Sequence, residues 1–462
     1  MKPKYFLALG LLVLGLGSCG ESFFEQYPSN NITEGNFYKT DDDFNQGVVA
    51  CYAKLKTQMS FHLTEIGYRG DENVLESMAV STQNRYDIDH FAETANNGIL
   101  NDIWNAWYNG IYRCNDVLDH MTGAKIANYD KYRGECLFLR SWWYFNLYRV
   151  FGVVPITRTV VTPAAAKLIP RCTEEEMYTL LTEDLAEAAR LLPPTPGPEK
   201  ARVANIAAYT LLAKVYLTFG KPAEAKTALE EAMKNTSYGL ESTTKKVFDV
   251  GNKMNREIIF ALYYNKTNDN GHGYWYSANT DVLADINNPT PTFKAIYDSE
   301  KDNRLPLISS YTKIKDNLFA MTKWYDTYDA TYTTQVGNDF PHLRYADVVL
   351  MYAEALAESG SSLGDALVWL NKTRTRAGLD ELTTDEVKSL AEFRRELAAE
   401  RGREFALEGH RWFDLVRLGL AVDYFREMGY SLDSHNLIFP IPQNQIEIVN
   451  NPSILWQNPG FN

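Results

Sequence analysis

Residues 202–236 read RVANIAAYTLLAKVYLTFGKPAEAKTALEEAMKNT, and this stretch decides the fold class. In its first half, residues at spacings of three, one and three form one face of a predicted helix: Tyr209, Leu212, Ala213 and Tyr216. A turn signal follows at Gly220 and Pro222, because glycine tolerates turn conformations and proline suits the first turn of a helix. The second half alternates small, large and small residues at Ala225, Leu229 and Ala232. The stretch therefore predicts two short helices that pack closely together.

These offsets match the tetratricopeptide pattern, in which small residues let two helices approach while larger side chains fill the gaps. A generic helical hairpin is the alternative. A looser copy runs from Tyr352, Ala353 and Leu356 to Ala366 and Leu370, and another joins residues within 137–148 to residues within 181–188. Stacked units of this kind bury one continuous core and act as a scaffold.

Helical periodicity also dominates the remainder of the chain. We expect helices at 41–58, 101–121, 130–151, 174–192, 202–219, 222–235, 342–359, 363–377 and 389–418. Strand-like patterns are brief and occur at 257–264 and 437–440. Charges at helical spacing between 395 and 411 predict an exposed or packed ion-pair network. The predicted fold class is mainly α, with helical pairs that form a scaffold.

Composition excludes several classes of protein. The chain has 462 residues, of which 45% are hydrophobic and 23% charged, so it can bury a large core and is not disordered. Its formal net charge of −13 disfavours nucleic acid as a partner. The five cysteines form no CxxC pair and no zinc-like spacing. We interpret Cys51, Cys114, Cys136 and Cys172 as buried thiols, with one disulfide left open, and we predict no metal and no cofactor.

The N-terminus has the proportions of a lipoprotein signal. Lys2 and Lys4 precede an apolar run at 5–16, which is too short to span a bilayer. The run ends in Leu-Gly-Ser-Cys, which resembles a bacterial lipobox and predicts acylation at Cys19. An ordinary secretory signal is the alternative. We therefore expect a signal peptide at 1–18 and a lipidated tether at 19–40.

Between 237 and 340 the helical period fails, and the stretch is rich in asparagine, aspartate, threonine and tyrosine. Loops on a rigid scaffold are where binding sites usually lie. Aromatic rings edged by amides and carboxylates suit sugars, because sugar C–H faces stack on rings. We predict ligand contacts at Trp275, Tyr276, Trp324, Tyr325 and Tyr328, together with an earlier loop group: Tyr68, Arg69, Asp71, Asn96, Asn97 and Asn101.

Four ordered stretches together resemble the SusD/RagB family of nutrient-uptake lipoproteins. The first, LRSWWYFNLYRVFGVVPI, covers 139–156, and the second, RYADVVLMYAEA, covers 344–355. The third spans 394–417 and contains EGHRWFDL. The last joins LIFPIP at 437–442 to QNPGF at 457–461. With the lipobox, the resemblance covers nearly the whole chain in order, divided as 41–236, the irregular 237–340 and 341–462.

The resemblance implies four tetratricopeptide-like pairs beneath a loop-rich ligand-binding face. It implies a surface-exposed lipoprotein of the outer membrane, whose partner is a SusC-like TonB-dependent transporter. The implied activity is binding of an oligosaccharide or polysaccharide, followed by its delivery to that transporter. A peptide ligand, as in RagB-like members, is the alternative.

An enzymatic function is a weaker alternative. No HExxH, GxSxG or P-loop motif occurs. A helical glycoside hydrolase would need two suitably separated carboxylates, for which the loops offer these candidates: Asp71, Glu72, Asp281, Asp326 and Asp329. We expect no catalytic residue among them.

Overall fold

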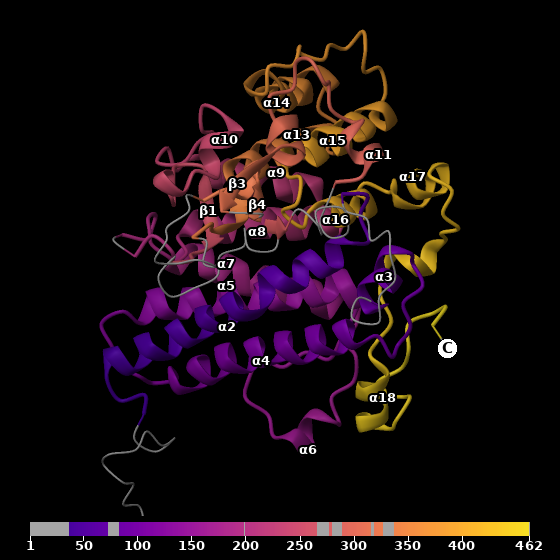
Figure 1. The fold of residues 1–462 in the computed structure, drawn as a ribbon. Helices are drawn as coiled ribbons and strands as arrows, with labels where there is room; N and C mark the ends of the chain where they lie inside the picture. Colours follow the sequence, from indigo (N-terminus) through magenta and orange to yellow (C-terminus); the bar gives the residue numbers. More distant parts are fainter. Residues whose placement is uncertain are drawn as a thin grey trace, which may run out of the picture.

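The computed structural model describes residues 37–72, 83–197, 199–265, 277–279, 289–315, 318–326 and 337–461. Among these residues, the helices that pack as a stack of pairs are α2 (Asp41–Gly67), α4 (Gly98–His120), α5 (Tyr129–Phe151), α7 (Glu174–Leu191), α8 (Asn205–Thr218), α9 (Pro222–Met233), α13 (Tyr345–Glu358) and α14 (Leu363–Arg376). They pack as four pairs, α2 with α4, α5 with α7, α8 with α9 and α13 with α14, and adjoining pairs also touch. The mainly α fold is confirmed, and Figure 1 shows the stack.

The pair α8–α9 packs as its sequence predicts. Ala213, Ala225 and Ala232 are fully or almost fully buried, so the helix backbones lie close together. Leu229 fills the space between them, while Tyr209 packs half-buried against the core. Helix α13 covers α9 although more than 100 residues separate them in the chain, and this contact continues the stack across the irregular region.

Further helices surround the stack. They are α3 (Gln83–Asp89), α6 (Pro163–Ala166), α10 (Thr244–Val247), α11 (Pro291–Lys294), α12 (Leu305–Ser309), α15 (Leu390–Glu404), α16 (Arg411–Arg417), α17 (Ala421–Glu427) and α18 (Gln443–Val449). Short 3₁₀ turns are η3 (Val250–Asn252), η5 (Thr322–Trp324) and η6 (Ser434–Leu437). None of the described helices is both long and apolar enough to cross a membrane.

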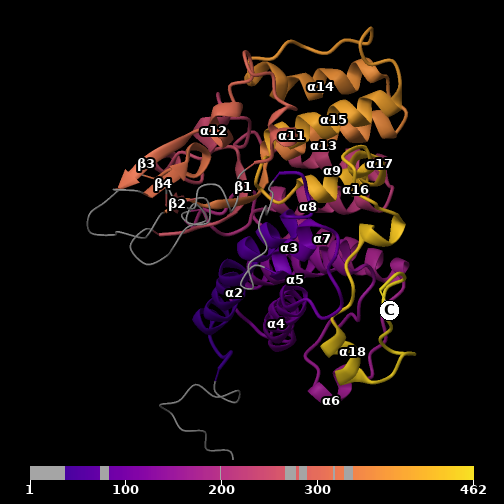
Figure 2. The same ribbon diagram turned by 45° about the vertical axis from the view of Figure 1, so that its right-hand side comes forward.

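Two small antiparallel sheets occupy the irregular region. Strand β1 (Ile258–Leu262) pairs with β5 (Phe340–Arg344), which confirms the predicted strand at 257–264. Strand β4 (Leu318–Met321) lies between β2 (Ser277–Asn279) and β3 (Tyr311–Lys315). Figure 2 shows that the second sheet projects to one side of the helical stack.

Two secondary-structure predictions are wrong. The helix expected at 389–418 is interrupted between α15 and α16, where Leu407 and Gly409 have left-handed backbone angles (φ 63° and 75°). The strand expected at 437–440 is absent, because the chain there leaves η6 and the Phe439 amide donates to the carbonyl of Val150 instead of to a strand. Both differences arise from tertiary contacts that local periodicity does not encode.

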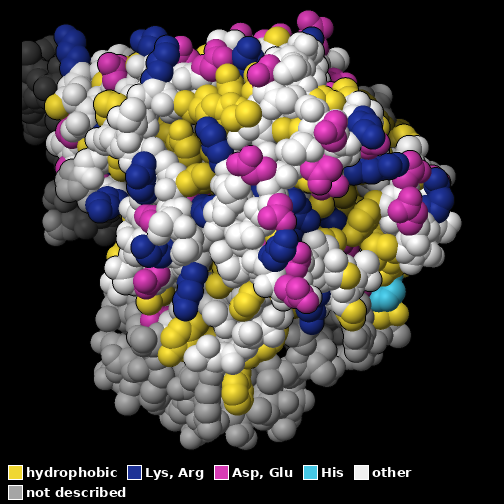
Figure 3. All heavy atoms as spheres, turned by 90° about the horizontal axis from the view of Figure 1, so that it is seen from above, with side chains coloured by type: hydrophobic (Ala, Val, Ile, Leu, Met, Phe, Trp, Pro, Cys, Tyr) yellow, Lys and Arg dark blue, Asp and Glu magenta, His cyan; other side chains and the backbone are white. Residues whose placement is uncertain are grey.

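The four described cysteines are buried free thiols, so no disulfide joins any of them. One large apolar cluster runs from α2 to the C-terminal segment, and a second, small cluster gathers Val247, Ile258 and Ala261. The division into 41–236, 237–340 and 341–462 stays a prediction. The face seen from above in Figure 3 carries interspersed acidic and basic side chains around small apolar areas.

Candidate ligand-binding face

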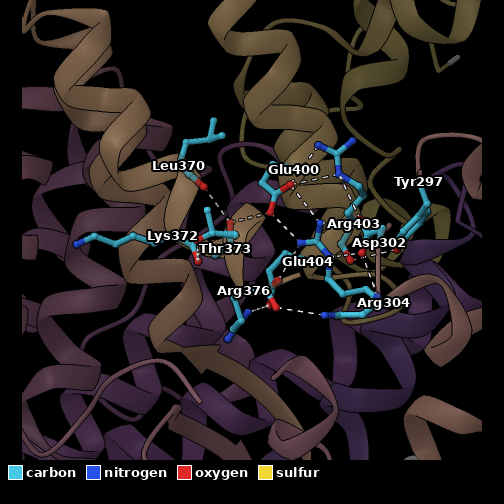
Figure 4. A network of polar contacts seen from close by, with 12 residues as sticks. Tyr297, Asp302, Arg304, Leu370, Lys372, Thr373, Arg376, Glu400, Arg403 and Glu404 are labelled. Carbon is cyan, nitrogen blue, oxygen red and sulfur yellow. Dashed lines mark hydrogen bonds and ion pairs between the residues drawn. The ribbon is translucent and has the colours of Figure 1, made fainter. Parts of the chain in front are cut away.

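A buried ionic network fixes the segments that carry the irregular region. Arg304 donates to Asp302 and Glu400 at 2.8 and 2.7 Å, and the same guanidinium reaches Glu404 at 3.0 Å. Figure 4 shows these groups together with Thr373, which donates to Glu400 at 2.7 Å. All of these side chains are buried. Of the charges predicted between 395 and 411, those from Glu400 to Arg411 therefore belong to a packed network, whereas Arg395 is exposed.

The same network reaches β5 through Arg344. Its guanidinium donates to Glu257 at 2.7 Å and to Glu408 at 2.8 Å, and it also pairs with Glu404. Burial raises the pKa of Glu404, but the charges of Arg376, Arg344 and Arg304 outweigh burial and hold that pKa well below its usual range. Because breaking one buried ion pair costs about 3–5 kcal/mol, this network holds β5, α15 and the segment around Arg304 firmly together.

The early loop group is anchored in the interior. Arg69 pairs with Glu93, and its guanidinium lies 3.7 Å from the ring centre of Phe439. Asp71 accepts two hydrogen bonds from Arg411 at 2.8 and 3.2 Å. These contacts tie the end of α2 to the C-terminal helices.

Several predicted ligand residues prove to be core residues. Tyr68, Arg69, Asp71, Asn97 and Trp324 are all buried, and Trp324 has no exposed surface. The Trp324 ring packs 5.1 Å from Phe248, and the Asn97 side chain caps α4 by accepting from the Ile99 amide at 3.1 Å. The prediction of these five as surface contacts is corrected, because their side chains fill the interior or cap a helix.

The other predicted residues divide into two groups. Asn96 is exposed, Tyr325 is half-buried, and Asn101 is half-buried and accepts from Gln445 at 3.2 Å on the side of α4 that faces α18. Trp275, Tyr276, Tyr328 and the acylation residue Cys19 lie outside the described residues. The structure thus places Asn101, one turn along α4 from Asn97, against α18.

An exposed ring at the edge of the irregular region escaped sequence reasoning. Tyr263 directly follows β1, is 44% exposed and has the ammonium of Lys253 4.2 Å from its ring centre. Lys253 is held by Asp339 at 2.8 Å, and Asp339 also accepts from the Tyr264 amide at 2.9 Å. A fixed cation therefore supports one side of an exposed ring. Its only sequence signal was the pair of tyrosines at the exit of a predicted strand.

A concave surface, the α4 groove, lies between α4, residues 155–169 and α18, with a volume of about 380 Å³. Three rings line it at one-turn spacing along α4: Trp104, Tyr108 and Tyr112. The Tyr108 hydroxyl donates to the carbonyl of Pro155 at 2.7 Å, which closes one wall. Two of the lining residues, Tyr112 and Ile448, are exposed apolar side chains, and further exposed apolar residues directly adjoin lining residues in the chain: Val160, Leu168 and Trp456. The groove is therefore an apolar surface of the kind that proteins use to contact one another.

Comparison with known proteins agrees with this architecture. Residues 27–217 match a family described as "Starch-binding associating with outer membrane", and residues 302–461 match the SusD family. SusD-like protein P2 of Formosa agariphila is 25% identical over 99% of this chain and 100% of its own length.

Solved structures share the fold. A SusD superfamily protein from Bacteroides vulgatus superposes with a TM-score of 0.78 at 23% identity, covering 92% of this chain and 100% of that one. Surface glycan-binding protein A of Bacteroides thetaiotaomicron, solved with laminarihexaose, gives 0.75 at 21% identity over 91% and 99% of the two chains. The chain therefore belongs to the SusD/RagB family.

Proposed function

We propose that the protein binds oligosaccharide or polysaccharide nutrients at its loop-rich face and delivers them to a SusC-like TonB-dependent transporter. The observation that carries this proposal is the match of residues 27–217 to a starch-binding, outer-membrane family. The laminarihexaose complex of a protein with the same fold supports a glycan as the ligand class.

The family is one of binding proteins, not enzymes. The described carboxylates that a hydrolase would need have structural roles instead. Asp71 is paired with Arg411, Glu72 accepts from the Leu407 amide at 3.0 Å, and Asp326 accepts from the Gly337 amide at 2.8 Å. Each is buried and already engaged.

Within the face, we propose that ligand contacts come from the rings of Trp275, Tyr276, Tyr325 and Tyr328, with Asn96 at the border. Tyr263 is added because its ring is exposed and braced by Lys253. A ring in this state can stack on a sugar without first being ordered, which lowers the entropic cost of binding.

Affinity electrophoresis in gels containing starch, laminarin or other polysaccharides, with calorimetry against oligosaccharides and peptides, tests the ligand class. We expect retardation by at least one polysaccharide and a matching heat of binding for its oligosaccharide. Binding to peptides with no binding to any glycan would reject the glycan proposal and favour the RagB-like alternative.

For the transporter, the α4 groove is the surface that we propose as the contact. Its exposed apolar side chains are costly to leave in water and gain free energy when a partner covers them. The tether supports the same assignment. Tyr38, a described residue of the predicted tether, stacks on His120 in the last turn of α4 at a ring distance of 4.4 Å, which places this part of the tether against the helix that lines the groove.

We propose that Cys19 carries the lipid that holds the protein at the outer-membrane surface. Changing Cys19 to Ala should move the protein from the membrane fraction to the soluble fraction, because acyl chains supply about 0.8 kcal/mol per buried methylene. Retention of the variant in washed membranes would contradict the lipid anchor. The substitution itself should leave glycan binding unchanged, because Cys19 is not among the proposed ligand contacts.

A further inference from the structure

A second cavity lies on a part of the molecule that the proposed function does not use. It has a volume of about 270 Å³ and lies between the C-terminal end of α5, helix α8 and helix α16. Buried Lys214, His410 and Phe413 line its interior, and half-buried Tyr148, Thr218 and Ile438 form its rim. We call it the Arg149 cavity after the guanidinium that also lines it.

Arg149 has no acidic partner. Its guanidinium donates to the side-chain oxygen of Asn146 and lies 3.9 and 4.7 Å from the ring centres of Phe413 and Phe145. Within the described part of the chain, no carboxylate forms an ion pair with it, and its Nε is buried without a hydrogen-bond acceptor. Arg149 is half-buried with its Nε out of contact with solvent, and charges withdrawn from water are ordinarily paired, so this arrangement lacks an anion.

The neighbouring charges balance without Arg149. Asp347 pairs with Lys214 and Arg401 at 2.5 and 2.9 Å. Asp414 pairs with Arg401 and Arg417 at 2.7 and 3.0 Å, and Glu354 completes the group by pairing with Arg417 at 2.8 Å. Three carboxylates thus meet three cations. Burial holds the pKa of His410 well below its usual range, so His410 adds no charge, and Arg149 remains as one excess positive charge.

The carbonyl end of α5 offsets part of this charge, because Arg149 lies in the last turn, where the helix dipole favours a cation. A dipole does not supply a hydrogen-bond acceptor for the buried Nε. Burial also lowers the pKa of Arg149 to about 9, although the charge of Asp414, which lines the same cavity and is itself paired with Arg401 and Arg417, acts to raise it. An oxyanion in the cavity would supply both the acceptor and the charge.

We propose that the Arg149 cavity binds the carboxylate or sulfate group of a small acidic ligand, no larger than a single acidic sugar. The guanidinium of Arg149 takes the oxyanion, and the half-buried rim around Tyr148 and Ile438 contacts the remainder of the molecule. This site is separate from the loop-rich face, so neutral glycans that bind the face do not compete for it.

Thermal unfolding and calorimetry with sodium sulfate, sodium glucuronate and neutral glucose test the site, with ionic strength held constant by sodium chloride. We expect sulfate or glucuronate, but not glucose, to raise the unfolding temperature of the wild type. The variant Arg149→Met keeps an unbranched apolar stem and removes the charge, and it should weaken that response about tenfold or more. The matched control is Arg158→Met, since Arg158 is an exposed cation paired with Glu183.

The two acids distinguish the sources of the oxyanion: a response to both indicates an acid group on a sugar ring, and a response to sulfate alone indicates a free inorganic anion. Should Arg149→Met fail to fold, crystals of the wild type soaked in selenate decide the question, with an anomalous peak expected beside the Arg149 guanidinium. An undiminished response in Arg149→Met, or no selenate peak in the cavity, would overturn the proposal.

Discussion

Arg411 and Asp71 are 340 residues apart in the chain, and their side chains form a bidentate ion pair in the core, with Nε–Oδ1 and Nη2–Oδ2 distances of 2.8 and 3.2 Å. Tyr424 also donates to Asp71, and the carbonyl of Asp71 accepts from Thr290 at 2.8 Å. One aspartate therefore joins the end of α2, the return of the irregular loop and the C-terminal helices.

Changing Asp71 to Ala should reduce the free energy of unfolding by about 3–5 kcal/mol, because Arg411 would remain buried without its partner. Denaturant unfolding measures this. The double variant Asp71→Leu/Arg411→Met should recover much of the loss, since no charge stays buried. An equally unstable double variant would show that the pair is not the source of the effect.

Changing Trp324 to Ala should reduce stability by about 3–5 kcal/mol, the usual cost of removing a buried tryptophan. Its ring has no exposed surface and packs on Phe248 and Phe340. Thermal unfolding reports the change, and Tyr325→Ala is the adjacent control with a smaller expected loss. Full stability combined with lost glycan binding would restore Trp324 as a ligand contact.

Changing Tyr263 to Ala should weaken glycan binding roughly tenfold, about 1.4 kcal/mol, while stability changes by less than about 0.5 kcal/mol. The reason is that its exposed ring offers stacking area and contributes little to the core. Calorimetry with the tightest-binding oligosaccharide measures the affinity. The control Tyr112→Ala removes a similarly exposed ring from the α4 groove and should leave glycan affinity unchanged. Equal losses of glycan affinity in the two variants would contradict the assignment of glycan binding to the loop-rich face alone.

Changing Leu168 or Ile448 to Glu should reduce co-purification of the transporter from detergent-solubilised membranes. Each substitution places a charge on an exposed apolar surface that the partner is proposed to cover, and burying an unpaired charge is costly. Val368→Glu, an exposed apolar position on α14, is the matched control. If Val368→Glu reduced co-purification of the transporter and the two groove variants did not, the transporter contact would lie near α14 and not at the α4 groove.

Glu72 predicts a pH dependence of stability. Burial raises its pKa from 4.5 in the unfolded chain to about 8, while the Leu407 amide and the charges of Arg411 and Lys323 act against burial. The raised value means that the folded state favours the protonated form, so this stabilisation is present below pH 4.5 and is lost as pH rises through about 8. The variant Glu72→Gln should therefore gain stability relative to wild type between pH 5 and 9, by a few kcal/mol at about 1.36 kcal/mol per pKa unit. A constant difference across that range would contradict the assignment.

Local patterns identified the helical scaffold because the apolar residues of an amphipathic helix recur every three or four positions along the chain. The helices at 202–219 and 222–235 became α8 and α9 with small changes at their ends. Periodicity failed at 389–418, where Gly409 adopts a positive φ. A Cβ atom at this position would lie only 3.3 Å from the Cβ of Leu63 in α2, so the constraint on Gly409 comes from a helix that is distant in the chain.

The candidate site was less predictable because burial depends on tertiary contacts. Arg69 and Asp71 are charged loop residues of the type that binds sugars, yet each is paired with a residue far away in the chain: Asp71 with Arg411 and Arg69 with the carbonyl of Asn436. Tyr263 was passed over because it stood at the end of a predicted strand. Its exposure depends on the position of Lys253 and Asp339, which no local pattern specifies.

A crystal structure of the protein with its tightest-binding oligosaccharide tests the central idea most directly, namely that a rigid helical stack presents rings to a sugar and leaves the sugar intact. We predict an unbroken oligosaccharide against the loop-rich face, with a sugar ring stacked on Tyr263. Sugar bound only in the α4 groove, or glycosidic bonds cleaved in the crystal, would contradict the account.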